Sequence, residues 1–179
     1  MMNKRFLAEF GVLSNFSFLK GGSHPEEYVK QAIKLDLSGL AITDENSVAG
    51  VVKAYSAISS LSKNKSLLLK LIVGARIITK DNFSITTIVK NLKGWKNLCR
   101  ILTTITSTNY NDIRHPSLQR IISLRGGLIF LIHPPEESED PLILKNWIRS
   151  TQKLSKNLSN SYMILSPKYD SLDSTRFRN

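Results

Sequence analysis

The stretch Gly39–Val52, which reads GLAITDENSVAGVV, decides the fold of this chain. Its first five residues form a mostly apolar run that ends in two β-branched residues, and two carboxylates, Asp44 and Glu45, follow directly. From Ser47 onward, apolar residues recur at the spacing of an amphipathic helix. A buried strand that ends in polar residues and passes into a helix is the repeating unit of α/β proteins.

Similar units lie on both sides of this stretch. We expect strands at Phe6–Leu13, Gly39–Thr43, Lys70–Ile78, Ser84–Val89, Gly127–Ile132 and Tyr162–Leu165. We expect helices that start at Ser23 and His115, and others over Ser47–Leu61, Trp95–Ile105 and Pro141–Leu154. This alternation predicts a parallel α/β sheet or barrel.

Functional side chains of such folds gather where the strands end. In this chain, those positions hold two carboxylates (Asp44 and Glu45), one arginine (Arg76) and one histidine (His133). The set includes no pair of histidines close in sequence. Asp44 is expected to cap the following helix or to hydrogen-bond the turn, and His133 is expected to have a structural role.

Length and composition narrow the class of protein. The 179 residues are 41% hydrophobic and 22% charged, which fits one globular domain. A single cysteine excludes an intramolecular disulfide and a multi-cysteine zinc site. The apolar runs are too short for a membrane span, and no signal peptide is recognisable, so we expect a cytoplasmic protein without membrane contact.

The net charge of +11 predicts a polyanionic partner, with nucleic acid the most common class. The positive charge is spread along the chain and is densest from Lys145 to Asn179. That segment carries seven cationic residues (Lys145, Arg149, Lys153, Lys156, Lys168, Arg176 and Arg178) against two acidic ones. One hypothesis is therefore a basic module that binds DNA or a protein partner.

Four strings resemble one family in order and spacing: Leu13–Glu27 (LSNFSFLKGGSHPEE), Gly39–Val52, Leu71–Ala75 (LIVGA) and Gly94–Thr103 (GWKNLCRILT). They resemble the N-terminal PHP (polymerase and histidinol phosphatase) domain of bacterial DNA polymerase III α-type subunits, and are closest to the error-prone, damage-tolerant branch. Ser161–Arg176 resembles that domain more weakly. The resemblance implies a distorted seven-stranded (β/α) barrel, and a place in a polymerase complex or on DNA.

Active members of this family hold divalent metals, but the family's ligand positions are altered here. The resemblance places them on Gly11, Leu13, Asp44, Glu45 and Arg76, and a later histidine position near Ser84. By this resemblance, only Asp44 keeps its ligand type, and Arg76 brings a positive charge to the site. The resemblance therefore implies a degenerate metal site, no metal cofactor for this chain, and no catalytic residue.

By the same resemblance, residues 1–179 form a single domain segment equal to roughly the first two thirds of the PHP domain. The closing strands of the barrel and the polymerase core are expected beyond Asn179. We therefore expect a structural role beside a polymerase module that acts in replication or repair. The competing hypotheses are a stand-alone metal-dependent phosphoesterase with a reduced site at Asp44, Glu45 and His133, the basic binding module, and a remnant that folds poorly.

Overall fold

A computed structural model describes residues 7–61, 69–105, 115–135 and 141–165 of the chain. The strands are β1 (Ala8–Val12), β2 (Gly39–Ile42), β3 (Lys70–Ile78), β4 (Ser84–Val89), β5 (Leu128–Ile132) and β6 (Ser161–Met163). The helices are α1 (Pro25–Lys34), α2 (Ala49–Leu61), α3 (Leu92–Leu102), α4 (Leu118–Ser123) and α5 (Pro141–Asn157). No helix within these ranges is long and apolar enough to cross a membrane.

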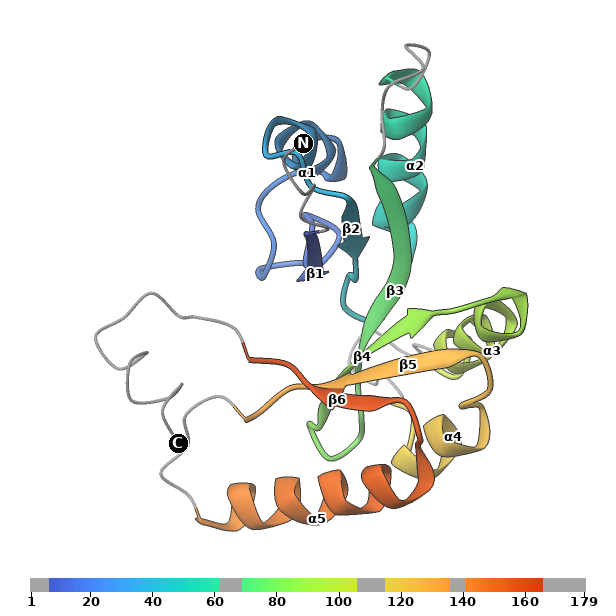
Figure 1. The fold of residues 1–179 in the computed structure, drawn as a ribbon. Helices are drawn as coiled ribbons and strands as arrows, with labels where there is room; N and C mark the ends of the chain where they lie inside the picture. The colour runs from blue at the N-terminus through green and yellow to red at the C-terminus, as the bar shows by residue number, and fades with distance from the viewer. Residues whose placement is uncertain (1–6, 62–68, 106–114, 136–140, 166–179) are drawn as a thin grey trace, which may run out of the picture.

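The strands form one sheet in chain order, from β1 to β6 (Figure 1). The sheet curls so that its two edges come close together. A Cβ atom added to Gly11 on β1 would lie 3.4 Å from the Cδ1 atom of Ile164, just after β6. The two edge strands thus approach each other, as they do in an incomplete barrel. The predicted α/β barrel-like architecture is confirmed.

One strand of the sheet departs from the expected parallel arrangement. β1, β2 and β3 are mutually parallel and β6 is parallel to β5, but β4 runs antiparallel to both β3 and β5. Only residues 79–83 connect β3 to β4, and a parallel crossover needs a dozen residues or more. The Thr79 N–H donates to the Phe83 carbonyl at 3.0 Å, and Asn82 takes a left-handed φ of 53°. The connection is therefore a tight hairpin.

Two apolar clusters build the core. The first lies between β1–β3 and the helices α1 and α2, and it contains Val29, Leu40 and Ile42. The second lies between β3–β6 and the helices α3, α4 and α5, and it contains Leu98 and Phe130. Figure 1 shows these two groups of helices around different parts of the sheet. The strand β3 serves both clusters along its length: Leu71 and Val73 belong to the first cluster, and Ala75 and Ile77, further along the same side of the strand, belong to the second.

Two helix starts differ from the predictions. His24, and not Ser23, is the N-cap of α1, and its N–H donates to the Glu27 carboxylate at 2.7 Å. The helix α3 begins three residues earlier than expected, because the Asn91 side chain accepts the Gly94 N–H at 3.0 Å and caps it. Trp95, in the first turn of α3, is 37% exposed.

Candidate functional site

Asp44 lies just beyond the carboxyl end of β2 and is fully buried. Its Oδ1 atom accepts hydrogen bonds from the Ser14 N–H at 2.7 Å, the Ser14 hydroxyl at 2.9 Å and the Ser17 hydroxyl at 2.8 Å. Its Oδ2 atom lies 2.8 Å from the same Ser14 hydroxyl. Both oxygens of the carboxylate are therefore directed at donors from the loop between β1 and α1.

The local sequence of that loop brings both serines to the carboxylate. The Ser17 N–H donates to the Ser14 carbonyl at 2.8 Å, and the Gly21 N–H donates to the Ser17 carbonyl at 2.9 Å. Residue 21 must be glycine, because a Cβ atom there would lie 2.1 Å from the Ser14 carbonyl oxygen. The turn is therefore compact, and both serines are buried.

The helix α2 closes the other side of Asp44. A Cβ atom on Gly50, in the first turn of α2, would lie 2.2 Å from Oδ2 and 2.8 Å from the Ser14 hydroxyl oxygen. Loop, strand and helix thus meet around the carboxylate. One of the two roles expected for Asp44 was to hydrogen-bond a turn. Asp44 does accept hydrogen bonds from a turn, but that turn lies between β1 and α1.

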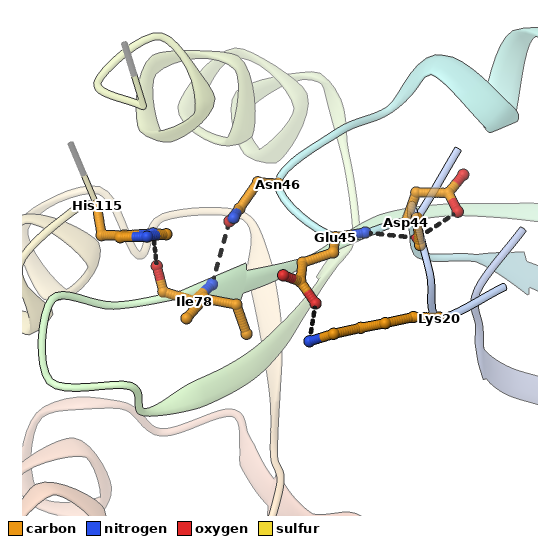
Figure 2. A network of polar contacts seen from close by, with 7 residues as sticks. Lys20, Asp44, Glu45, Asn46, Ile78 and His115 are labelled. Atoms are coloured by element: carbon orange, nitrogen blue, oxygen red, sulfur yellow. Dashed lines mark hydrogen bonds and ion pairs between the residues drawn. The ribbon is translucent and has the colours of Figure 1, made fainter. Parts of the chain in front are cut away.

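Glu45, the neighbouring carboxylate, points toward the loop and solvent. Its Oε2 atom lies 2.6 Å from the Lys20 Nζ, and its N–H donates to the Ser17 hydroxyl at 3.0 Å (Figure 2). The Glu45 side chain is 22% exposed and the Lys20 side chain 51% exposed. Two carboxylates that are adjacent in sequence therefore have different environments, one satisfied by serines and one paired with a lysine.

Polar contacts continue from this point to β3 and α4. The Ile78 N–H donates to the Asn46 side-chain oxygen at 3.1 Å, and the Ile78 carbonyl lies 3.1 Å from the His115 Nδ1 (Figure 2). Asn46 has a φ of 53°, a left-handed conformation that asparagine tolerates well. These contacts tie the end of β2 to the end of β3, and they are structural in character.

His133 lies just beyond β5 in a different setting. Its Nε2 atom lies 2.8 Å from the Thr86 hydroxyl on β4, and its carbonyl accepts the Trp147 Nε1–H at 2.7 Å. Burial, and secondarily the positive charge of Arg76, lower the pKa of His133 to about 4. The imidazole is therefore neutral at pH 7 and takes part in packing the end of the sheet.

The geometry does not fit a divalent metal at the positions that the resemblance marks. Gly11 has a φ of 83° and no side chain, Leu13 offers no ligand atom, and Arg76 is cationic. Asp44 is occupied by the serines. Within the described ranges, no group of three histidine, cysteine, aspartate or glutamate side chains is placed to hold a metal ion. Asp44, Glu45 and His133 are thus not brought together as such a group.

Ser14 and Ser17 are the residues of this site that the sequence analysis missed. Their signal is a pair of serines three residues apart, directly after the first strand. Because β1 pairs with β2 in parallel, these serines come to the same edge of the sheet as Asp44. The position of the two serines after the first strand and of Asp44 after the second is therefore the sequence signal for their contact.

The fold and this site define a PHP-type α/β domain. The PHP domain family model matches residues 10–159, and the chain belongs to that family.

Curated relatives are error-prone DNA polymerases. Over 131 residues the chain is 35% identical to the enzyme of Rhodopseudomonas palustris strain BisB5, with 72% of this chain covered. The enzyme of Sinorhizobium medicae is 32% identical over 166 residues, or 92% of this chain, and that of Vibrio vulnificus strain YJ016 is 45% identical over 135 residues, or 75%. The matches span 11%, 14% and 13% of these relatives, so the chain corresponds to a small part of their length.

Solved structures support the fold alone. A Bifidobacterium adolescentis protein, described as a candidate metal-dependent phosphoesterase, superposes with a TM-score of 0.51 at 14% identity, covering 81% of this chain and 74% of that one. An amidohydrolase of Chromobacterium violaceum with bound sulfate gives a TM-score of 0.50 at 12% identity, covering 87% and 76%. The predicted family and barrel-type fold are confirmed.

Proposed function

We propose that this chain is the PHP-type segment of an error-prone DNA polymerase-like protein, and that it has a structural role without a metal centre of its own. The observation that carries this proposal is the state of Asp44. Ser14 and Ser17 donate hydrogen bonds to its carboxylate, which is 0% exposed. A metal ion at this position would have to displace those donors and open the loop.

The charge around the site supports the same proposal. The backbones of Glu45 and Arg76 form a parallel β-bridge that extends the β2–β3 pairing, so Arg76 lies beside the residue that follows Asp44. The positive charge of Arg76 also contributes to the lowered pKa of His133. A guanidinium within this region raises the free energy of any divalent cation placed nearby. The residues that remain therefore favour a hydrogen-bonded structural junction over a metal centre.

In this role the Asp44 junction fixes the loop between β1 and α1 against the ends of β2 and β3. The relatives are polymerases, and a rigid PHP-type segment beside a polymerase module fits the family context. Residues 1–179 would act as one domain segment, in keeping with the single continuous sheet of the described strands. The proposal implies that the partners are DNA and a polymerase complex, and that the location is the cytoplasm.

The alternative is a phosphoesterase with a reduced site at Asp44, Glu45 and His133. A neutral imidazole at His133 is chemically able to bind a metal. However, Glu45 is paired with Lys20, and the Nε2 atom of His133 contacts Thr86. This alternative has weaker support than the structural role.

Metal content and hydrolysis test the structural role directly. The purified chain is equilibrated with Mn²⁺ or Zn²⁺, freed of unbound metal and analysed by mass spectrometry, and then assayed with bis-(p-nitrophenyl) phosphate. We expect substoichiometric metal and no hydrolysis above the rate of Asp44→Asn. Stoichiometric metal, together with hydrolysis that Asp44→Asn abolishes, would establish the phosphoesterase instead.

The polymerase context needs a separate measurement. An antibody against the α1 segment reports the size of the native gene product on a denaturing gel. A band much larger than 20.1 kDa is expected if the segment belongs to a polymerase-like protein. A band at 20.1 kDa would contradict the polymerase part of the proposal and leave the structural role to be judged by metal binding.

A further inference from the structure

The two halves of the described chain differ sharply in charge. Residues 7–61 and 69–81 carry seven lysines and arginines and seven aspartates and glutamates, so their formal charges cancel. Residues 82–105, 115–135 and 141–165 carry ten lysines and arginines and no acidic residue. The acidic residues of the second half, such as Asp112 and the run Glu136–Asp140, all lie outside the described ranges. The described residues on and beside α3, α4 and α5 are therefore cationic, and the nearest described carboxylate in the sequence is Asp81, on the β3–β4 hairpin.

The helix α5 concentrates this charge on one face. Lys145, Arg149, Lys153 and Lys156 follow one another at intervals of four, four and three residues, which places them within an arc of about 80° of the helix. All four are exposed, and they lie on the far side of α5 from the buried Leu154. The stripe is about 16 Å long at 1.5 Å per residue.

The remaining cations of this half lie on other elements. They lie on or beside α3 and α4, which pack on the same apolar cluster as α5 (Figure 1). All six are exposed: Lys90, Lys93, Lys96, Arg100, Arg120 and Arg125. No carboxylate of the described residues in this half neutralises them.

We propose that this cationic face, with the α5 stripe (Lys145, Arg149, Lys153 and Lys156) as its main contact, binds the sugar–phosphate backbone of nucleic acid. One strand of B-DNA carries a phosphate about every 3.4 Å along the axis, so the stripe matches the length of about five phosphates. Lysine and arginine on a helix contact phosphates without reading bases. The proposed binding is therefore independent of sequence, and it does not depend on whether the Asp44 junction holds a metal.

An acidic protein surface is the competing occupant, because α5 also exposes Ile143, Leu144 and Ile148. Nucleic acid is favoured because ten exposed cationic side chains lie on or beside the three helices, against the few large apolar side chains that α5 exposes. Counterion release from DNA gives the two occupants different salt dependences.

The test measures binding of the chain to a fluorescent duplex of random sequence at several salt concentrations. The stripe variant is Lys145→Gln, Arg149→Gln, Lys153→Gln and Lys156→Gln. The matched control removes the same charge from exposed sites of the balanced half: Lys30→Gln, Lys34→Gln, Lys53→Gln and Lys80→Gln. Circular dichroism verifies that both variants keep the helix content of the parent.

We expect the stripe variant to bind at least about tenfold more weakly, and the slope of log K against log salt to fall by about 3 to 4 units, since each phosphate contact contributes about 0.9. The control variant should keep the parent slope within about one unit. Equal losses in the two variants would overturn the proposal, because they would show a response to net charge alone. Stronger competition by poly-glutamate than by unlabelled duplex would also overturn it, in favour of an acidic protein.

Discussion

Replacing Asp44 with alanine tests the junction most severely. The Ser14 N–H, the Ser14 hydroxyl and the Ser17 hydroxyl would all lose their acceptor in a buried setting. Each buried donor without a partner costs about 1–3 kcal/mol, and the two hydroxyls recover part of this by rotating toward other acceptors. We therefore expect Asp44→Ala to lower the free energy of unfolding by about 3–5 kcal/mol. That loss is a large share of the roughly 5–15 kcal/mol by which domains are stable.

Asp44→Asn is the graded comparison. An asparagine keeps one carbonyl oxygen for the Ser14 N–H and the Ser17 hydroxyl, and its amide can donate to the Ser14 hydroxyl oxygen. The expected loss is about 1–2 kcal/mol. Urea denaturation followed by tryptophan fluorescence measures both variants, with the m-value showing whether the transition remains two-state.

The same titrations in Mn²⁺ and in EDTA separate a junction from a metal site. The hydrogen-bonded junction predicts identical midpoints in both buffers for the parent and for both variants. A metal site predicts that Mn²⁺ stabilises the parent and that the increment disappears in Asp44→Asn. That second pattern, or a loss below about 1 kcal/mol for Asp44→Ala, would refute the reasoning about the serines.

Three further changes test other parts of the structure. The pKa of His133 is about 4 in the fold against 6.5 for a free imidazole, so the unfolded chain binds more protons between these values. Stability should therefore fall as the pH decreases from 6.5 to 4, by at most about 3 kcal/mol, and His133→Gln should flatten this part of the pH profile. Gly94→Ala should lower the free energy of unfolding by about 2–4 kcal/mol in thermal or urea denaturation, because the new Cβ would lie 1.9 Å from the Gly127 carbonyl oxygen. The control Gly22→Ala should be neutral, because a Cβ there meets no atom within 4 Å. Asn91→Ala removes the cap of α3 and should cost about 1 kcal/mol in urea denaturation; an unchanged midpoint would show that the cap contributes nothing.

The positions of the strands could be predicted from the sequence because each is an apolar run bounded by turn residues. The limits of β3 and β4 agree with the prediction residue for residue. The direction of β4 could not be predicted from its own residues, since direction depends on which neighbours a strand pairs with. The short connection at residues 79–83 was the one local sign of a hairpin.

The candidate site was predictable only in part, for a related reason. The place of Asp44 at the end of a buried strand follows from the local pattern, and the structure confirms that position. Its partners come from a loop about thirty residues earlier, and their approach depends on the β1–β2 pairing and on the tight turn at Gly21. The sequence also located the densest positive charge, at residues 145–179, but the common face of Lys145, Arg149, Lys153 and Lys156 depends on the helix α5 that carries them.

The two apolar clusters have a consequence for the dynamics of the molecule. They share the strand β3, which gives Leu71 and Val73 to one cluster and Ala75 and Ile77 to the other, and both also contact Val48. Separate cores of this kind open as separate cooperative units, each with its own free energy. Native-state hydrogen exchange should therefore divide the amides into two classes that meet within β3. A partner bound to α5 would slow exchange in the second class, and it would affect the amides around Asp44 through β3 and the shared contact at Val48.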